Sequence, residues 1–396
     1  MRDLTGFYND VAASCGREVA DAVSELHSLF DDGIYKWLAG LWDSSIGGFY
    51  YSNSARDNAE FLPDMESTAQ AFNNLESTGI IAAMPVPLSM QKKAIAFMQS
   101  KQDPEDGYFY HPQWGKDINT SRRARDLGHG ISVMRRFGAT PLYPTAIERI
   151  GAAAAGNSAA DTVPEHLRSK AAFIEYLEGL GINEKSYSIG HCIGQQTREI
   201  KAAGLADVCI DFLNSTQKKN GFWEDTLTHS SSNGTMKISC AYVDLGRPFP
   251  NLMTALDSAI EVLLSDQPIK AITEIFNPPF TLLNFLEILE RTGDKENLAI
   301  AKAKIRDRAA AILRVTTERL VPFKKPDGAF SYLPESSSFW SQGKPVCVNG
   351  SYESDVNANS LANGSRVRPL LILGITPPAL FDERDAKLFY EMCGEM

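Results

Sequence analysis

The sequence contains no long uninterrupted apolar stretch. Nowhere do its 396 residues approach the roughly 18 consecutive apolar positions that a membrane-spanning helix needs. The segment from Met1 to Phe7 also lacks the apolar core of a secretory signal peptide. These absences argue against a membrane partner and predict a cytoplasmic protein.

Paired cysteines and phosphate-binding loops are also missing. The six cysteines are scattered, and no two of them have the C-x-x-C spacing. This pattern argues against a disulfide framework and against a structural zinc site. Because neither a glycine-rich phosphate loop nor a clustered set of metal ligands is present, no metal and no organic cofactor is expected.

An excess of positive charge is missing from this chain, because 39 lysines and arginines stand against 49 aspartates and glutamates. Its formal net charge is −10, whereas a nucleic-acid-binding protein normally carries an excess of lysine and arginine. Nucleic acid is therefore not an expected partner. Hydrophobic residues at 43% and charged residues at 22% are ordinary values for a globular chain with a large core. The composition does not indicate an oligomeric state.

One short stretch recurs four times at the ends of helical segments. Each copy joins a polar turn to a glycine and then to aromatic residues. Asp-Gly and Asn-Gly favour tight turns because glycine adopts a positive φ without steric cost. The aromatic residue that follows is expected to pack between two helices. The copies contain Gly47-Gly48-Phe49, Gly107-Tyr108-Phe109, Gly221-Phe222-Trp223 and Gly328-Ala329-Phe330.

Helical apolar spacing dominates the segments between these turns, and strand signals are few. The spacing predicts helices over residues 17–41 and 358–373, and a helix that opens at Pro63. Asn277 followed by two prolines predicts another helix start. A polar loop is expected through His229, with a helix resuming at Met236. Residues 151–164, rich in alanine, glycine and serine, predict a helix end and a flexible connection. About a dozen helices result.

This arrangement resembles the repeat of squalene–hopene cyclases and protein prenyltransferase β-subunits. The closest local match is the first glycine-aromatic turn followed by Asp64-Met65-Glu66-Ser67-Thr68-Ala69-Gln70-Ala71. The resemblance implies an all-α fold, an α/α toroid in which inner and outer rings of helices form a single domain over residues 1–396. Long polar loops would lie at one mouth of its central cavity. Six-hairpin glycosidases and several polysaccharide lyases look similar, so the fold does not decide the chemistry.

The functional motifs of the two repeat families are absent from this chain. It contains no Asp-x-Asp-Asp, which a class II terpene cyclase needs to protonate an alkene. It also has no Asp-x-Cys with a later histidine at the positions where a prenyltransferase holds zinc. Both absences argue against isoprenoid chemistry.

In a toroid, the polar segments that follow the turns would converge on one mouth of the cavity. The candidate catalytic side chains on these segments include a closely spaced pair, Glu353 and Asp355, which could divide into an acid and a base. The alternatives are helix caps for Asp64 and Glu66, and a buried, backbone-bonded role for His129. The full set of catalytic candidates is Asp64, Glu66, Asp126, His129, Tyr352, Glu353 and Asp355.

Basic and aromatic residues near the same segments are candidates for substrate binding. If several cations face the cavity of an otherwise acidic protein, the ligand is expected to be anionic. The alternatives are a lysine that extends to solvent for Lys237 and an exposed helix for Arg366. The substrate-binding candidates are His111, Trp114, Arg125, Lys237 and Arg366.

These residues favour a carbohydrate-active enzyme that acts on a small or oligomeric glycan, possibly one containing uronate. In a hydrolase, Glu353 or Asp355 would be the general acid, with Asp64, Glu66 or Asp126 as its partner. In a lyase, His129 or Tyr352 would remove the proton α to a uronate carboxylate that an arginine or lysine neutralises. The alternatives are an isoprenoid enzyme and a non-catalytic toroid that binds a glycan or a protein.

Overall fold

The computed structural model describes residues 2–156 and 163–396, and the regular secondary structure of these residues is almost entirely helical. Two short antiparallel hairpins are the exceptions. One pairs β1 (Trp42–Asp43) with β2 (Gly48–Phe49), and the other pairs β3 (Trp340–Ser341) with β4 (Lys344–Pro345). The prediction of an all-α fold is therefore confirmed. In the part of the chain that the structure describes, no helix combines the length and the apolar character needed to cross a membrane.

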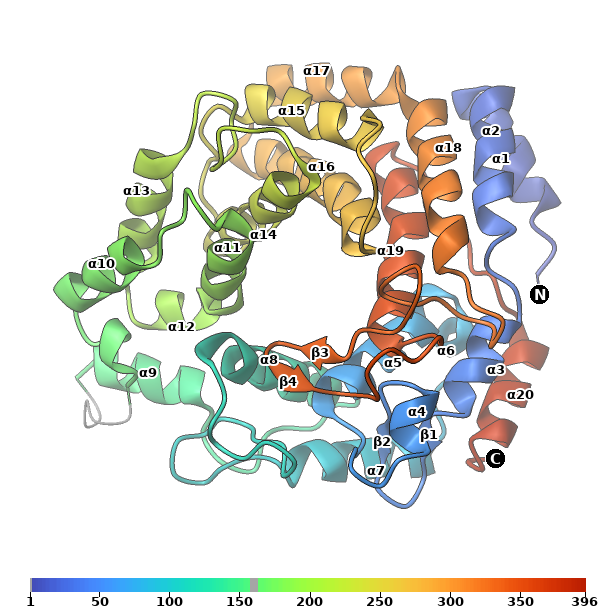
Figure 1. Cartoon of the computed structure of the whole chain (residues 1–396), viewed down its shortest axis with the longest axis horizontal. Helices are drawn as coiled ribbons and strands as arrows, with labels where there is room; N and C mark the ends of the chain where they lie inside the picture. The colour runs from blue at the N-terminus through green and yellow to red at the C-terminus, as the bar shows by residue number, and fades with distance from the viewer. Residues whose placement is uncertain (1, 157–162) are drawn as a thin grey trace.

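Six helices contact one another in a closed cycle, so that the last contacts the first (Figure 1). We call these six helices the central ring. Each lies close in space to the next, although they come from positions spread along nearly the whole chain. In order around the cycle they are α5 (Met65–Ser77), α8 (Thr120–Arg136), α11 (Ser186–Gln195), α14 (His229–Leu245), α16 (Thr273–Thr292) and α19 (Val356–Ile372).

The other helices lie outside the central ring or join its members (Figure 1). They are α1 (Thr5–Cys15), α2 (Arg17–His27), α3 (Gly33–Ala39), α4 (Asn53–Arg56), α6 (Ile80–Ala83), α7 (Leu88–Gln99), α9 (Ala146–Ala154), α10 (Lys170–Gly179), α12 (Thr197–Ala202), α13 (Ala206–Thr216), α15 (Leu252–Leu264), α17 (Lys295–Arg306), α18 (Ala309–Leu320) and α20 (Glu383–Met392), with the 3₁₀ turns η2 (Glu165–Leu167) and η3 (Val321–Phe323). One buried hydrophobic cluster extends from Val11 to Cys393 and holds both sets together.

The four glycine-aromatic turns share one geometry. Their first glycines, Gly47, Gly107, Gly221 and Gly328, all have a positive φ, between 76° and 110°. A Cβ atom on any of them would overlap backbone atoms of a neighbouring segment. The phenylalanine of each turn is completely buried. The predicted turn conformation and aromatic packing are confirmed.

Several predicted helix boundaries need correction. The helix predicted over 17–41 is two helices, α2 and α3, because the Asp31 carboxylate accepts a hydrogen bond from Gly33 N at 2.9 Å and starts a new helix there. α16 begins at Thr273, before the proline pair, because Phe276 N already donates to Ile272 O at 3.1 Å. α14 begins at His229 and not at Met236, since Thr228 caps it by accepting from Ser231 N.

Other boundaries agree with the prediction. α5 begins at Met65 behind the cap Asp64, and α19 covers nearly all of the predicted last helix. α9 ends at Ala154, inside the segment where a helix end was expected. Residues 157–162 of the predicted flexible connection lie outside the described residues.

Candidate functional site

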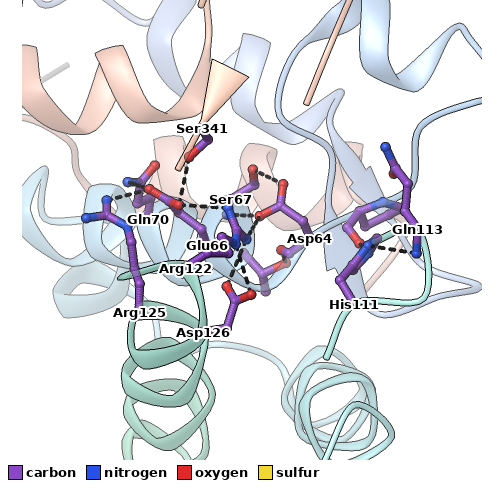
Figure 2. Close-up of polar contacts among 12 residues, drawn as sticks. Asp64, Glu66, Ser67, Gln70, His111, Gln113, Arg122, Arg125, Asp126 and Ser341 are labelled. Atoms are coloured by element: carbon purple, nitrogen blue, oxygen red, sulfur yellow. Dashed lines mark hydrogen bonds and ion pairs between the residues drawn. The ribbon is translucent and has the colours of Figure 1, made fainter. Parts of the chain in front are cut away.

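An ion-pair network occupies the amino-terminal turns of α5 and α8 (Figure 2). At its centre is Arg122, which is fully buried. Its Nε donates a hydrogen bond to Asp126 Oδ2 at 2.9 Å, and its Nη2 forms an ion pair with Asp126 Oδ1 at 2.8 Å. Nη1 donates to Glu66 Oε2 at 3.2 Å. The ring of Trp114 covers the guanidinium at 4.2 Å. Arg122 and Asp126 are four positions apart on α8, which places them on one face of the helix.

Glu66 accepts hydrogen bonds from several groups at once (Figure 2). Arg125 donates to Oε1, Ser341 Oγ donates to Oε2 at 2.9 Å, and Gln70 Nε2 donates to Oε1 at 3.0 Å. Burial alone would raise the pKa of this carboxyl, but the charges of Arg125 and Arg122 outweigh burial and hold the pKa well below its ordinary value. Glu66 is therefore a fixed anion that already has its partners. It is not a free general acid or base.

The other two acidic residues of the network also have structural roles. Asp64 is the amino-terminal cap of α5, accepting from Ser67 N at 2.9 Å and from Ser67 Oγ at 2.5 Å. Asp126 holds Arg122 with both carboxylate oxygens. Burial nevertheless raises the pKa of Asp126 to about 7, although Arg122 lowers it. The helix cap expected as the alternative for Asp64 is confirmed, and its catalytic role stays a prediction.

Glu353 and Asp355, the predicted acid–base pair, are held by hydrogen bonds from neighbouring loops. Glu353 accepts from Ser52 Oγ at 2.7 Å and from both Oγ and N of Ser54, at 2.5 and 2.8 Å. Asp355 caps α19 by accepting from Ala358 N at 2.7 Å, and it also accepts from Tyr332 N at 2.8 Å. Burial raises the pKa of Asp355 to about 7. Both carboxylates therefore organise the chain, and the catalytic role expected for this pair stays a prediction.

Three further candidates lie in structural surroundings. Tyr352 is 64% exposed, with Lys325 Nζ 5.0 Å from its ring centroid. His111 is buried and donates from Nε2 to Pro63 O at 2.9 Å, next to the Trp114 ring. Arg366 is fully buried and donates from Nη2 to Ser77 O at 2.8 Å, which satisfies the end of α5. The binding roles expected for His111 and Arg366, and the catalytic role of Tyr352, stay predictions. Trp114 covers Arg122.

Two of the predicted residues, Arg125 and His129, line a cavity of about 430 Å³ between α5, α8, α12 and α14. Nε2 of His129 is buried and has no hydrogen-bond partner among the described residues. Burial, followed by the charge of Arg125, lowers the pKa of His129 to about 3, so the imidazole is neutral. The other charged or nucleophilic residues of the lining are Arg198, Glu199, Cys240 and Asp244.

Glu199 is the acidic residue of this cavity that sequence reasoning missed. It is 3% exposed, and its Oε1 accepts a hydrogen bond from the Tyr108 hydroxyl at 2.9 Å. Burial raises the pKa of Glu199 to about 7, although the Tyr108 bond and the charge of Arg123 lower it. Nothing in the local sequence distinguishes Glu199 from other helical glutamates, because only the packing of α12 against α9 and α14 places it here.

Lys237 lies on α14 next to this cavity, half-buried. Among the described residues it makes no hydrogen bond and no ion pair. Burial, followed by the charge of Arg125, lowers the pKa of Lys237 to about 8. Gly190 and Gly194 of α11 allow this close helix packing, because a Cβ on either would lie 3.0–3.2 Å from atoms of Lys237.

No family model, no curated protein and no solved structure matches this chain. The site is therefore described by its own residues. Within residues 2–156 and 163–396, no group of three or more His, Cys, Asp or Glu side chains is arranged to hold a metal ion.

The β3–β4 hairpin extends from the carboxy-terminal third of the chain toward α8 (Figure 1). It carries Ser341, which binds Glu66, and Gln342, whose Oε1 lies 2.7 Å from His191 Nε2. The backbone oxygen of Gln342 accepts from Asn119 Nδ2 at 2.9 Å, which fixes the hairpin to the start of α8. The hairpin thus joins the amino-terminal ends of α5 and α8 to the middle of α11.

Proposed function

We propose that this chain is an α/α toroid of a single domain over residues 1–396, and that it acts as a lyase on an anionic, uronate-containing glycan. The closed cycle of contacts in the central ring, with further helices outside it, supports the toroid (Figure 1). Each glycine-aromatic turn packs closely against the backbone of a neighbouring segment, and this repeated packing supports the same arrangement.

One observation carries the proposed chemistry. A cation, a neutral imidazole and a carboxyl of raised pKa line the same cavity, as Arg125, His129 and Glu199. Elimination from a uronate needs these three functions: a positive group for the carboxylate, a base for the α-proton and an acid for the leaving oxygen. The pKa of His129 is lowered and that of Glu199 is raised, and such opposite shifts fit a base and an acid in one site.

The proposed reaction starts when the uronate carboxylate pairs with Arg125, which makes the neighbouring C–H bond more acidic. The charge of Arg125 is one cause of the low pKa of His129. The incoming carboxylate offsets this charge, so it raises the pKa of the imidazole and makes it a stronger base. His129 Nε2 removes the proton, and the electron pair of the C–H bond forms a carbon–carbon double bond. The bond to the oxygen at the β-carbon breaks, and this oxygen takes a proton from Glu199.

A hydrolase is less well supported by these contacts. The carboxylates expected to form a hydrolase pair are engaged in caps, loop contacts or the Arg122 network. An isoprenoid enzyme needs a dry, aromatic cavity, whereas charged side chains line this one. A non-catalytic toroid that binds an anionic glycan would use the same cations. The assay described next distinguishes binding alone from elimination.

The test is incubation with a panel of polyuronides, following the ultraviolet absorbance of an unsaturated uronate product. Wild type is expected to produce this absorbance, with a rate that falls as pH rises through about 7, because Glu199 must hold its proton. His129→Ala and Glu199→Gln are expected to lower kcat at least 100-fold. Glu178→Gln, on the exposed side of α10, is the matched control.

Two outcomes would contradict the proposal. Binding of polyuronides without any product would favour the non-catalytic toroid. New reducing ends without the unsaturated absorbance would identify a hydrolase instead.

A further inference from the structure

Small side chains form one wall of the 430 Å³ cavity along α8. Ala124, Gly128 and Ser132 are four positions apart, so they follow one face of the helix, and all three line the cavity. From the first to the last of them the helix rises about 12 Å. A single sugar ring is shorter than this wall. The cavity therefore has length for a second sugar unit beside the one whose carboxylate pairs with Arg125.

Arg198 of α12 reaches this wall near its centre. A Cβ atom on Gly128 would lie 3.7 Å from Arg198 Nη1, and it would meet no other atom of a neighbouring segment within 4 Å. Glycine inside a helix is less stable than alanine, and close packing of another backbone does not account for it here. The missing side chain leaves the space next to the guanidinium open. Gly128 directly precedes His129, so this space lies beside the turn of α8 that carries the proposed base.

Among the charged residues of the lining, Arg198 is the one without a partner. It is exposed, and within the described part of the chain it forms no hydrogen bond and no ion pair. Arg125, by contrast, pairs with Glu66. The two acids of the lining also have other partners, since Glu199 accepts from Tyr108 and Asp244 Oδ2 accepts from Thr197 Oγ1 at 2.7 Å. A ligand carboxylate can therefore pair with Arg198 without displacing a protein group.

We propose that Arg198 is a specificity-determining residue that binds the carboxylate of a second uronate, the unit next to the one at Arg125. The preferred substrate then carries acidic units in succession, and a chain in which acidic and neutral units alternate is a poorer one. A guanidinium suits this role because it can donate two parallel hydrogen bonds to one carboxylate. The nature of the ligand rests on the proposed function, whereas the role of Arg198 concerns binding and not proton transfer.

The test compares two oligosaccharides of equal length, one of consecutive uronates and one in which uronates alternate with neutral sugars. In calorimetry, wild type is expected to bind the consecutive oligomer tighter by roughly tenfold or more, as for a hydrogen-bonded charge pair. Arg198→Met is expected to bind both oligomers equally, and Arg198→Lys to keep part of the preference. Lys201→Met is the matched control, because Lys201 is an exposed cation of α12 outside the cavity lining.

The kinetics of elimination give a second readout. Arg198→Met is expected to raise KM for the consecutive oligomer by roughly tenfold with little change in kcat, because the lost contact holds a unit that does not react. Equal binding of the two oligomers by wild type, or an unchanged preference in Arg198→Met, would refute the role of Arg198. If neither oligomer binds wild type, this role and the proposed function both fail. A preference that depends on Arg198 without any unsaturated product would support the role and count against elimination alone.

Discussion

At the scale of single residues, the surroundings and not the residue type decide the charge of a buried acid. Glu66 and Glu199 are 2% and 3% exposed. Two guanidinium groups surround Glu66, and its pKa is far below the ordinary value. Glu199 has a tyrosine hydroxyl as its direct partner, and burial raises its pKa to about 7. One of the two glutamates is a fixed anion, and the other can exchange a proton near neutral pH.

Glu199→Gln is expected to stabilise the protein at alkaline pH. The folded-state pKa of about 7 lies above the ordinary value of 4.5, so the folded protein holds a proton that the unfolded chain loses between these values. Stability is lost as pH rises through that window, and glutamine removes this loss while still accepting the Tyr108 bond. Urea unfolding should show a gain of roughly 1–3 kcal/mol at pH 8 and almost none at pH 4. An equal gain at both pH values would mean that the pKa of Glu199 is the same in the folded and unfolded states.

Arg122→Met is expected to destabilise the protein by about 3–5 kcal/mol, because it leaves Asp64, Glu66 and Asp126 buried together with one cation fewer. The double variant with Asp126→Asn should recover part of this loss, since it removes one of the unpaired charges. Denaturant unfolding of both variants tests the coupling. Additive losses would show that Arg122 and Asp126 contribute independently.

The sequence identified some of these residues and missed others for a physical reason. Arg125 and His129 were expected at the site because they lie near the polar segment that follows the second glycine-aromatic turn, and they do line the cavity. Glu353 and Asp355 resembled a catalytic pair, but a carboxylate that caps a helix has the same sequence pattern as one that faces a substrate. Glu199 became distinctive only through burial against Tyr108, nearly a hundred positions away.

At the scale of elements, the glycine-aromatic turns set the spacing between helices. Gly221 has φ of 82°, and a Cβ there would lie 2.5 Å from the nitrogen of Ala255 in α15. Neither the turn nor the backbone of α15 can move without disturbing the packing of Phe222 beneath it. These turns were predictable from sequence because few residues other than glycine adopt this conformation. Helix breaks such as the one at Asp31 were not predictable, since they depend on a local hydrogen bond between a side chain and the backbone.

Gly221→Ala is expected to cost more stability than Gly246→Ala. Both glycines have a positive φ, which costs alanine about 1–2 kcal/mol. Only Gly221 also faces a backbone clash, for which overpacking adds about 1–3 kcal/mol, whereas a Cβ on Gly246 meets nothing within 4 Å. Chemical unfolding of the two variants isolates the contribution of helix spacing. Equal losses would show that the backbone conformation alone accounts for the glycine.

At the scale of the whole molecule, contacts between distant parts of the chain close the ring. α19 contacts α5, and the two chain ends lie on the same side of the molecule (Figure 1). Arg2 N donates to Leu380 O at 3.0 Å, and Trp42 Nε1 donates to Glu395 Oε1 at 2.9 Å. An open array of helical repeats can lose an end unit and keep the rest. A closed cycle has no end unit, so the loss of any one helix removes two contacts, one with each neighbouring helix.

Removal of residues 383–396, which include α20, is expected to destabilise the whole protein. The truncation deletes Phe389 and Tyr390, both fully buried, and leaves Tyr35 without its partner Asp385. Loss of two buried aromatic side chains corresponds to at least about 5 kcal/mol. Thermal unfolding followed by circular dichroism should show a lower midpoint for the entire helical signal. A truncated chain that melts at the wild-type temperature would show that α20 adds little to the ring.

The closed ring also determines the order in which the sites form during synthesis. Glu66, Arg122 and Arg125 all precede residue 127, so their ion pairs can form while the rest of the chain is still being made. The contact between α5 and α19, which closes the ring, requires a helix that is synthesised near the end. A nascent chain can thus form the buried ion pairs between α5 and α8 before its ring is able to close.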